Sequence, residues 1–89
     1  MEYKIRLYDF YADWCQPCKQ VSTLLDQVLP NYPNVELVKI NVEEDIDFTD
    51  EKGIRGVPTL IFEKEGVEYK RFTGSISKDK LISFIEEGK

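Results

Sequence analysis

A stretch with helical periodicity separates two strand-like runs near the start of the chain. Ile5 to Tyr11 is rich in aliphatic and aromatic residues, and Val35 to Val42 has the same character. Between them, from Cys18 to about Leu29, apolar residues recur every three or four positions. A helix that joins two strands of one sheet makes them parallel, through a right-handed crossover. The sequence therefore predicts a β-α-β unit as the base of the fold.

The rest of the chain predicts a helix, a hairpin and a closing helix. Residues 43–52 favour a short helix with Ile46 and Phe48 as its apolar anchors, and Gly53 suits its end. Strands at residues 59–63 and 67–72 flank a turn at residues 64–66, and a last helix extends from a cap at Ser77 to about Glu87. The predicted order is β-α-β-α-β-β-α.

The composition limits the chain to one small domain. Its 89 residues, 42% hydrophobic and 33% charged, are enough for a single core, so we expect residues 1–89 to form one monomeric domain. The net charge of -5, with acidic and basic residues interspersed, disfavours nucleic acid and membrane surfaces as partners. The N-terminus begins with a strand pattern rather than a signal peptide, which favours a cytoplasmic protein.

Cys15 and Cys18 are the only cysteines, and they lie at the predicted start of the first helix. A pair at this spacing can close a disulfide within one turn and reopen it, which is the chemistry of dithiol exchange. A purely structural disulfide gains little stability from closing so short a loop. The chain has no histidine and no further cysteine, so a zinc site would need carboxylates or a partner chain as ligands. No metal and no other cofactor are expected.

Three motifs together resemble the thioredoxin family. They are, in chain order, Asp9-Phe10-Tyr11-Ala12-Asp13-Trp14-Cys15-Gln16-Pro17-Cys18-Lys19, then Val38-Lys39-Ile40-Asn41-Val42, then Gly53-Ile54-Arg55-Gly56-Val57-Pro58-Thr59-Leu60. Gly74 and the closing helix match as well. The resemblance implies an α/β thioredoxin fold, with a four-stranded mixed sheet flanked by three helices. It also implies a protein-disulfide reductase that is regenerated by an electron donor of the thioredoxin-reductase type.

If the chain exchanges disulfides, the position of each cysteine suggests its role. Cys15, at a helix N-terminus, is expected to be the attacking thiol, because free backbone N–H groups favour its thiolate. Cys18, one turn further on, is expected to be the more buried, resolving thiol. Asp9 shares a strand face with Ile5 and is expected to be buried, with a raised pKa that suits a proton acceptor for Cys18. Lys39, in the matching position of the next strand, would moderate that shift; an exposed Asp9 is the alternative.

The resemblance also implies a substrate-binding surface beside the cysteines. Trp14 would form part of a platform, although core packing is its alternative role. Pro58 would follow a cis peptide bond, and the backbone of Val57 would pair with an extended substrate. Gly56 and Gly74 would leave room for that substrate, or would serve ordinary turns. The complete expected set is Trp14, Gln16, Pro17, Gly56, Val57, Pro58 and Gly74.

Some features depart from the family pattern. The family usually begins with an extra strand and helix, and it has glycine where Gln16 stands here. Gln16 therefore bears on the redox potential. Pro17 suits the first turn of a helix whether or not it tunes that potential.

Two other functions remain open on the sequence. A glutaredoxin-like, glutathione-dependent reductase would share the fold, but Thr73-Gly74-Ser75 stands where such proteins have a glycine pair. A thioredoxin-like binding subunit of a larger complex is the second alternative.

Overall fold

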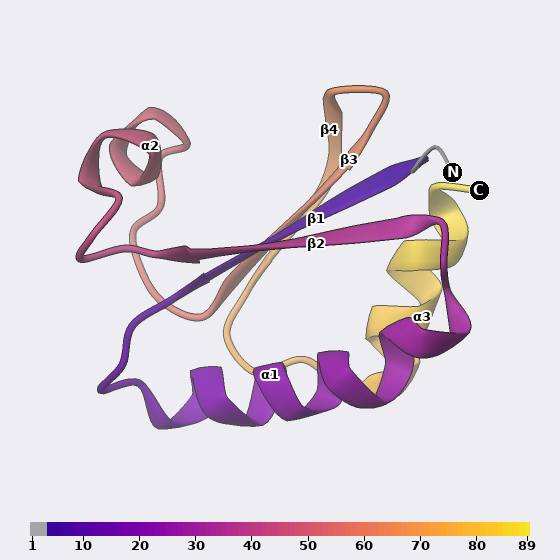
Figure 1. Ribbon diagram of the computed structural model, residues 1–89, viewed down its shortest axis with the longest axis horizontal. Coiled ribbons are helices and arrows are strands. Elements are labelled where there is room, and N and C mark those ends of the chain that lie inside the picture. Colours follow the sequence, from indigo (N-terminus) through magenta and orange to yellow (C-terminus); the bar gives the residue numbers. More distant parts are fainter. Residues whose placement is uncertain (1–3) are drawn as a thin grey trace.

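The computed structural model describes residues 4–89. In this range four strands form one sheet, and three α-helices pack around it (Figure 1). Residues 1–3, on which the argument against a signal peptide partly rests, lie outside this range. The elements are β1 (Ile5–Tyr11), α1 (Gln16–Val28), a short 3-10 turn (Leu29–Asn31), β2 (Val35–Asn41), α2 (Ile46–Glu51), β3 (Thr59–Lys64), β4 (Val67–Thr73) and α3 (Lys78–Glu87).

The sheet has the strand order β2-β1-β3-β4. β1 and β2 are parallel, with Ile5 opposite Val35 and Tyr11 opposite Asn41. β3 is antiparallel to both β1 and β4. Both parallel strands end on the side of the sheet where α1 begins (Figure 1). The predicted mixed sheet and its β-α-β crossover are confirmed.

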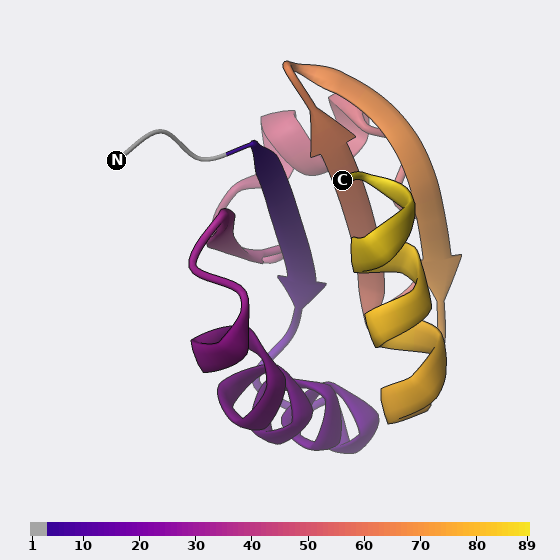
Figure 2. The ribbon, with the colours of Figure 1, turned by 90° about the vertical axis from the view of Figure 1, so that its right-hand side faces the viewer.

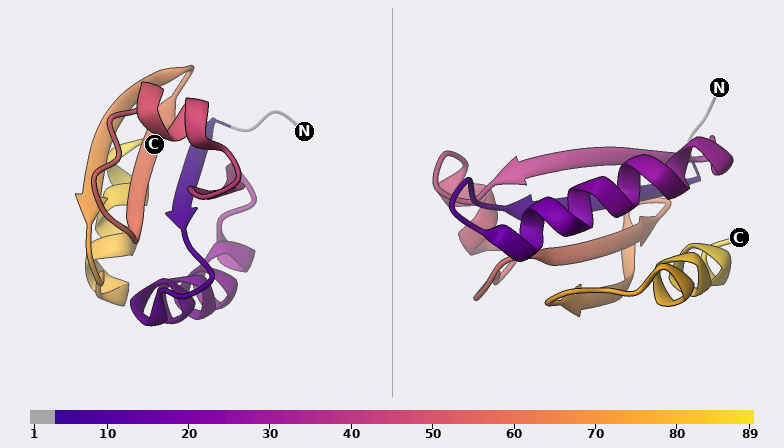
Figure 3. Two further views of the ribbon diagram at one scale, coloured as in Figure 1. Left: turned by 90° about the vertical axis from the view of Figure 1, so that its left-hand side faces the viewer. Right: turned by 90° about the horizontal axis from the view of Figure 1, so that it is seen from below.

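Helices cover both faces of the sheet. α1 and α3 lie side by side on one face (Figure 2), and α2 lies across the sheet from them (Figure 3, left). The main core fills the space under α1 and α3, where Leu25 and Leu81 are fully buried against Leu7. A second cluster under α2 contains Phe10 and Ile61. Two apolar layers therefore hold β1 at the centre of the molecule.

α2 is shorter than predicted, because the chain first makes a turn. The side chain of Asn41 accepts from the backbone N–H of Glu43 over 2.9 Å, and its carbonyl accepts from the N–H of Asp45. These bonds hold residues 43–45 outside the helix. Phe48 is an anchor, as predicted, and stacks on Phe10 with ring centroids 5.9 Å apart. Ile46 is not, because 57% of it is exposed in the first turn.

The hairpin turn is also tighter than predicted. Lys64 pairs with Val67, so only Glu65 and Gly66 lie in the turn. Both have positive φ, 54° and 81°, the backbone that a two-residue hairpin loop requires. Glycine accepts this conformation without steric cost, which explains the residue at position 66.

Candidate functional site

The two cysteines form a disulfide at the start of α1. After β1 ends, a turn closes as the N–H of Cys15 donates to the carbonyl of Ala12 over 3.1 Å. Cys15 then caps α1, because its Sγ accepts from the backbone N–H of Cys18, also over 3.1 Å. The helix begins at Gln16, two residues earlier than predicted, and Pro17 stands in its first turn, where a missing N–H costs nothing.

Both cysteines are buried in the disulfide. Each is only 3% exposed, so the prediction that Cys18 is more buried than Cys15 is wrong for this state. The physical reason is the disulfide bond itself, because each sulfur shields the other from solvent and Ala12 packs against both cysteines. Val57, from the segment before β3, packs against the same cluster. The disulfide therefore lies between the start of α1 and the loop that contains Pro58.

Asp9 is buried beneath the disulfide. Only 1% of it is exposed, which excludes the alternative of a solvated strand-end carboxylate. Its Oδ1 has no hydrogen-bond partner among residues 4–89. Burial raises the pKa of Asp9 to about 6, and the charge of Lys39 acts in the opposite direction. Asp9 and Cys18 both line a pocket of about 210 Å³. The Asp9 carboxylate and the Cys18 side chain thus border the same pocket.

Lys39 lies at the exposed side of that pocket. It is opposite Asp9 in the parallel register of β1 and β2. Its Nζ donates to Oγ of Ser22, on α1, over 2.7 Å. Ser22 also lines the pocket. The predicted proximity of Lys39 to Asp9 is confirmed, together with its moderating effect on the pKa of Asp9.

Trp14 is exposed rather than part of the core. Its exposed fraction is 68%, which excludes core packing as its role. The indole Nε1 donates to Oε2 of Glu43, the residue two positions after β2, over 2.9 Å. Trp14 lines a hollow of about 280 Å³ together with Gly56 and Val57. An exposed aromatic face is therefore fixed beside the segment expected to bind substrate.

Backbone and hydroxyl contacts hold the segment from Gly56 to Pro58. The peptide bond between Val57 and Pro58 is cis, as the family resemblance implied. The N–H of Gly74 donates to the carbonyl of Pro58 over 2.8 Å. Thr59 donates its hydroxyl to the carbonyl of Gly56 over 2.6 Å. These bonds leave the backbone of Val57 between two anchored neighbours.

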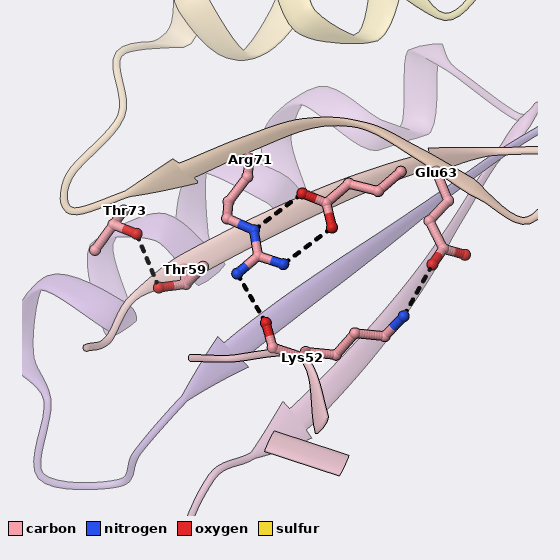
Figure 4. A network of polar contacts seen from close by, with 6 residues as sticks. Lys52, Thr59, Glu63, Arg71 and Thr73 are labelled. Carbon is pink, nitrogen blue, oxygen red and sulfur yellow. Dashed lines mark hydrogen bonds and ion pairs between the residues drawn. The ribbon is translucent and has the colours of Figure 1, made fainter. Parts of the chain in front are cut away.

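A wider polar network ties this segment to the hairpin (Figure 4). The hydroxyls of Thr59 and Thr73 lie 3.2 Å apart, and Nη1 of Arg71 donates to the carbonyl of Lys52 over 2.8 Å. Lys52 in turn pairs with the buried carboxylate of Glu63 at 3.5 Å. β3 and β4 thus hold both ends of the loop that follows α2.

Sequence reasoning missed Glu43, Ser22 and Thr59. Signals were present for two of them: Ser22 follows Cys18 by four residues on one helix face, and Glu43 follows the strand that is parallel to β1. Gln16 and Pro17 were predicted to bind substrate, and both lie exposed beside the cysteines. Their contacts among residues 4–89 do not test that role. Within residues 4–89, no three Asp, Glu or Cys side chains lie close enough together to hold a metal ion. No helix in the same range has the length and hydropathy of a membrane span.

The chain matches the family model described as Thioredoxin over residues 2–87. The thioredoxin of Pseudomonas aeruginosa is 36% identical over 81 residues, which cover 90% of this chain and 75% of that protein. Two solved structures agree with this likeness. A mutant thioredoxin from Halobacterium salinarum has a TM-score of 0.88 at 33% identity, with 96% of this chain and 74% of that chain covered. The thioredoxin of Fasciola hepatica has a TM-score of 0.90 at 28% identity, with 99% and 84% covered.

Proposed function

Since this chain belongs to the thioredoxin family and is a thiol-disulfide oxidoreductase that reduces protein disulfides, we propose a division of roles in which Cys15 attacks and Cys18 resolves. The observation that supports it is the position of Cys15 as the cap of α1, with its Sγ facing the N–H of Cys18. In the reduced protein, that N–H and the helix dipole favour the Cys15 thiolate.

The exchange proceeds in two steps. The Cys15 thiolate attacks one sulfur of a substrate disulfide, the substrate S–S bond breaks, and the other sulfur leaves as a thiolate that takes a proton from water. Cys18 then gives its proton to the Asp9 carboxylate, and its thiolate attacks Sγ of Cys15. The mixed disulfide bond breaks, the second substrate sulfur leaves as a thiolate that is protonated as Asp9 gives up its proton, and the Cys15–Cys18 disulfide of this structure remains. Two electrons have passed from the dithiol to the substrate.

The hollow beside Trp14 is the proposed binding site for the substrate chain. Its extent fits a short extended segment that pairs with the backbone of Val57, between the anchored carbonyls of Gly56 and Pro58. Gln16 and Pro17 would border this segment from α1, and Gly74 holds the far side of Pro58. The proposed substrates are therefore proteins with an accessible disulfide in an extended region.

We further propose the setting in which the cycle runs. An electron donor of the thioredoxin-reductase type returns the disulfide to the dithiol, so the chain acts in electron transport as a single monomeric domain. A reducing compartment such as the cytoplasm suits this cycle, because lone cysteine pairs there are more often catalytic than structural. Thr73-Gly74-Ser75, in place of a glycine pair, disfavours glutathione as the donor.

Coupled NADPH oxidation tests the donor and the activity together. With a protein disulfide as substrate, we expect faster turnover with NADPH and thioredoxin reductase than with NADPH, glutathione reductase and glutathione. Turnover supported only by glutathione would favour the glutaredoxin-like alternative, and turnover with neither would favour a binding subunit. In the same assay mixture without reductase, Cys18→Ser is expected to trap a mixed disulfide through Cys15, whereas Cys15→Ser traps none.

A further inference from the structure

The Lys39 ammonium is bound by a side chain of the helix that contains the cysteines. Ser22 lies one turn beyond Cys18 on α1, and its Oγ accepts from Nζ of Lys39 over 2.7 Å. Lys39 belongs to β2, where it is opposite Asp9. The bond therefore joins α1 to β2 at the exposed side of the pocket that contains Asp9.

This contact matters because a lysine on the surface is not fixed by its own chain. The flexible stem of lysine has many rotamers, and an ammonium group without a partner is mostly hydrated in solvent. A charge that moves into water is screened, and its effect on a buried carboxylate falls. The Ser22 hydroxyl, positioned by the helix, keeps the ammonium near the pocket instead.

The pocket has other polar residues, among them one further cation, Lys19, but only the charge of Lys39 acts on the pKa of Asp9. The pocket is also lined by Tyr11 of β1, by Asp13 from the turn before α1, and by Cys18 and Lys19 of α1. β3 contributes the apolar residue Leu60 opposite Asp9. Lys39 is the cation whose charge lowers the pKa of Asp9 against the larger, raising effect of burial.

We propose that Ser22 is a positioning residue, whose hydroxyl holds the Lys39 ammonium beside the Asp9 pocket and so sets how readily Asp9 accepts the proton of Cys18. Without this hydroxyl, Lys39 moves toward solvent and the ionised form of Asp9 loses a favourable charge. The catalytic consequence rests on the role of Asp9 proposed above. The placement of Lys39 by Ser22 does not.

The first experiment measures Asp9 directly. In the oxidised protein, carbon-13 NMR of the Asp9 carboxyl group follows its titration without reference to activity. Ser22→Ala is expected to raise the Asp9 midpoint by about 0.5 pH unit, whereas Ser22→Thr, which keeps the hydroxyl, is expected to restore the parent value. Ser83→Ala, a matched substitution on the exposed side of α3, is expected to leave the midpoint unchanged.

The double variant tests whether Lys39 mediates the effect. In a Lys39→Gln background, Ser22→Ala is expected to cause no further shift. An unchanged midpoint in Ser22→Ala, or an equal shift in the Lys39→Gln background, would overturn the proposal. The pH profile of disulfide exchange tests the catalytic role of Asp9 separately from the placement of Lys39. If Asp9 accepts the proton, the acidic limb of this profile is expected to move with the NMR midpoint. An NMR shift without a shift of this limb would support the placement of Lys39 and overturn the role of Asp9 as proton acceptor.

Discussion

The backbone N–H of Cys18 donates to Sγ of Cys15, and the two atoms lie 3.1 Å apart. This bond gives the two cysteines different electrostatic surroundings although their burial in the disulfide is the same. On reduction, the sulfur at the helix cap still faces an N–H group, which stabilises a thiolate there. The proposal that Cys15 is the attacking thiol therefore rests on the cap rather than on exposure.

Alkylation rates of single-cysteine variants check this assignment. Near neutral pH, Cys18→Ser is expected to react with iodoacetamide at Cys15 at least about tenfold faster than Cys15→Ser reacts at Cys18. The advantage is expected to shrink as the pH rises, because it depends on how large a fraction of each cysteine is present as thiolate. Mass spectrometry after brief labelling gives both rates, and equal rates at neutral pH would contradict the assignment.

The buried Asp9 predicts a pH-dependent cost in stability. Its pKa is raised from 3.8 to about 6, so the folded state binds a proton more tightly than the unfolded state. The stability gained from this proton is fully present below pH 3.8 and is lost as the pH rises through 6. Asp9→Asn avoids this loss. We therefore expect the free energy of unfolding of Asp9→Asn, measured relative to the parent, to be about 2 to 3 kcal/mol higher at pH 8 than at pH 4.

Urea unfolding of the oxidised proteins at the two pH values measures this effect. Asp26→Asn, a change on the exposed side of α1, is the matched control and is expected to show no comparable dependence. Asp9→Asn is also expected to exchange disulfides more slowly, since it removes the group that we propose as the proton acceptor for Cys18. If the gain of Asp9→Asn over the parent is no larger at pH 8 than at pH 4, the assigned pKa is contradicted, and a fully active variant would contradict the proposed catalytic role.

Gly56 and Gly74 are expected to respond differently to the same substitution. Gly74 has a φ of 102°, which a residue with a Cβ adopts only under strain, so Gly74→Ala is expected to destabilise the fold by about 1 to 2 kcal/mol. A Cβ at Gly56 would lie 3.9 Å from its nearest neighbour, in the side chain of Thr73. Gly56→Ala is therefore expected to change stability by less than about 0.5 kcal/mol.

Gly56 also lines the hollow with Trp14 and Val57, so the added methyl group, although directed toward Thr73, would add bulk at the border of that hollow. We expect a higher KM for a protein disulfide and an unchanged rate with a small-molecule disulfide. Thermal unfolding and the two assays together separate structure from binding. If Gly56→Ala unfolds as easily as Gly74→Ala, then Gly56 serves the turn rather than the substrate.

The sequence pattern was sufficient to predict those features that depend on hydrophobic periodicity or on the order of helices and strands along the chain. The apolar spacing between two strand-like runs predicted the parallel pair β1 and β2. The alternation along β1 placed Asp9 on the face of Ile5, and that face is buried. The motif around the cysteines predicted a loop-to-helix junction at Cys15, although the helix begins at Gln16 and not at Cys18.

What failed depended on individual polar contacts of side chains, one of them local and two of them between distant parts of the chain. Ile46 was expected to anchor α2, but the side chain of Asn41 captures the N–H of Glu43 and delays the helix, which turns Ile46 outward. The hydrogen-bond partners of Trp14 and Lys39 were not predicted, since each bond joins residues far apart in the sequence. Periodicity shows which face a residue occupies, but not which polar side chain will meet it there.

Trp14 and Glu43 provide a last test of the substrate surface. The indole is exposed, and its single polar atom is bound to the Glu43 carboxylate, so the ring can present an apolar face without moving freely. Trp14→Ala is expected to raise KM for a protein disulfide about tenfold, equivalent to about 1.4 kcal/mol, and to affect a small disulfide little. Glu43→Ala is expected to have a smaller effect in the same direction.

Because Trp14 is the only tryptophan, its fluorescence anisotropy reports the mobility of the ring directly. Glu43→Ala is expected to increase the fast motion of the indole, whereas Glu43→Gln, which keeps an oxygen acceptor, is expected to remain close to the parent. Glu44→Ala removes a neighbouring exposed carboxylate and serves as the control for charge alone. If Glu43→Ala raises KM while the anisotropy stays unchanged, Glu43 acts on the substrate itself and not through the orientation of Trp14.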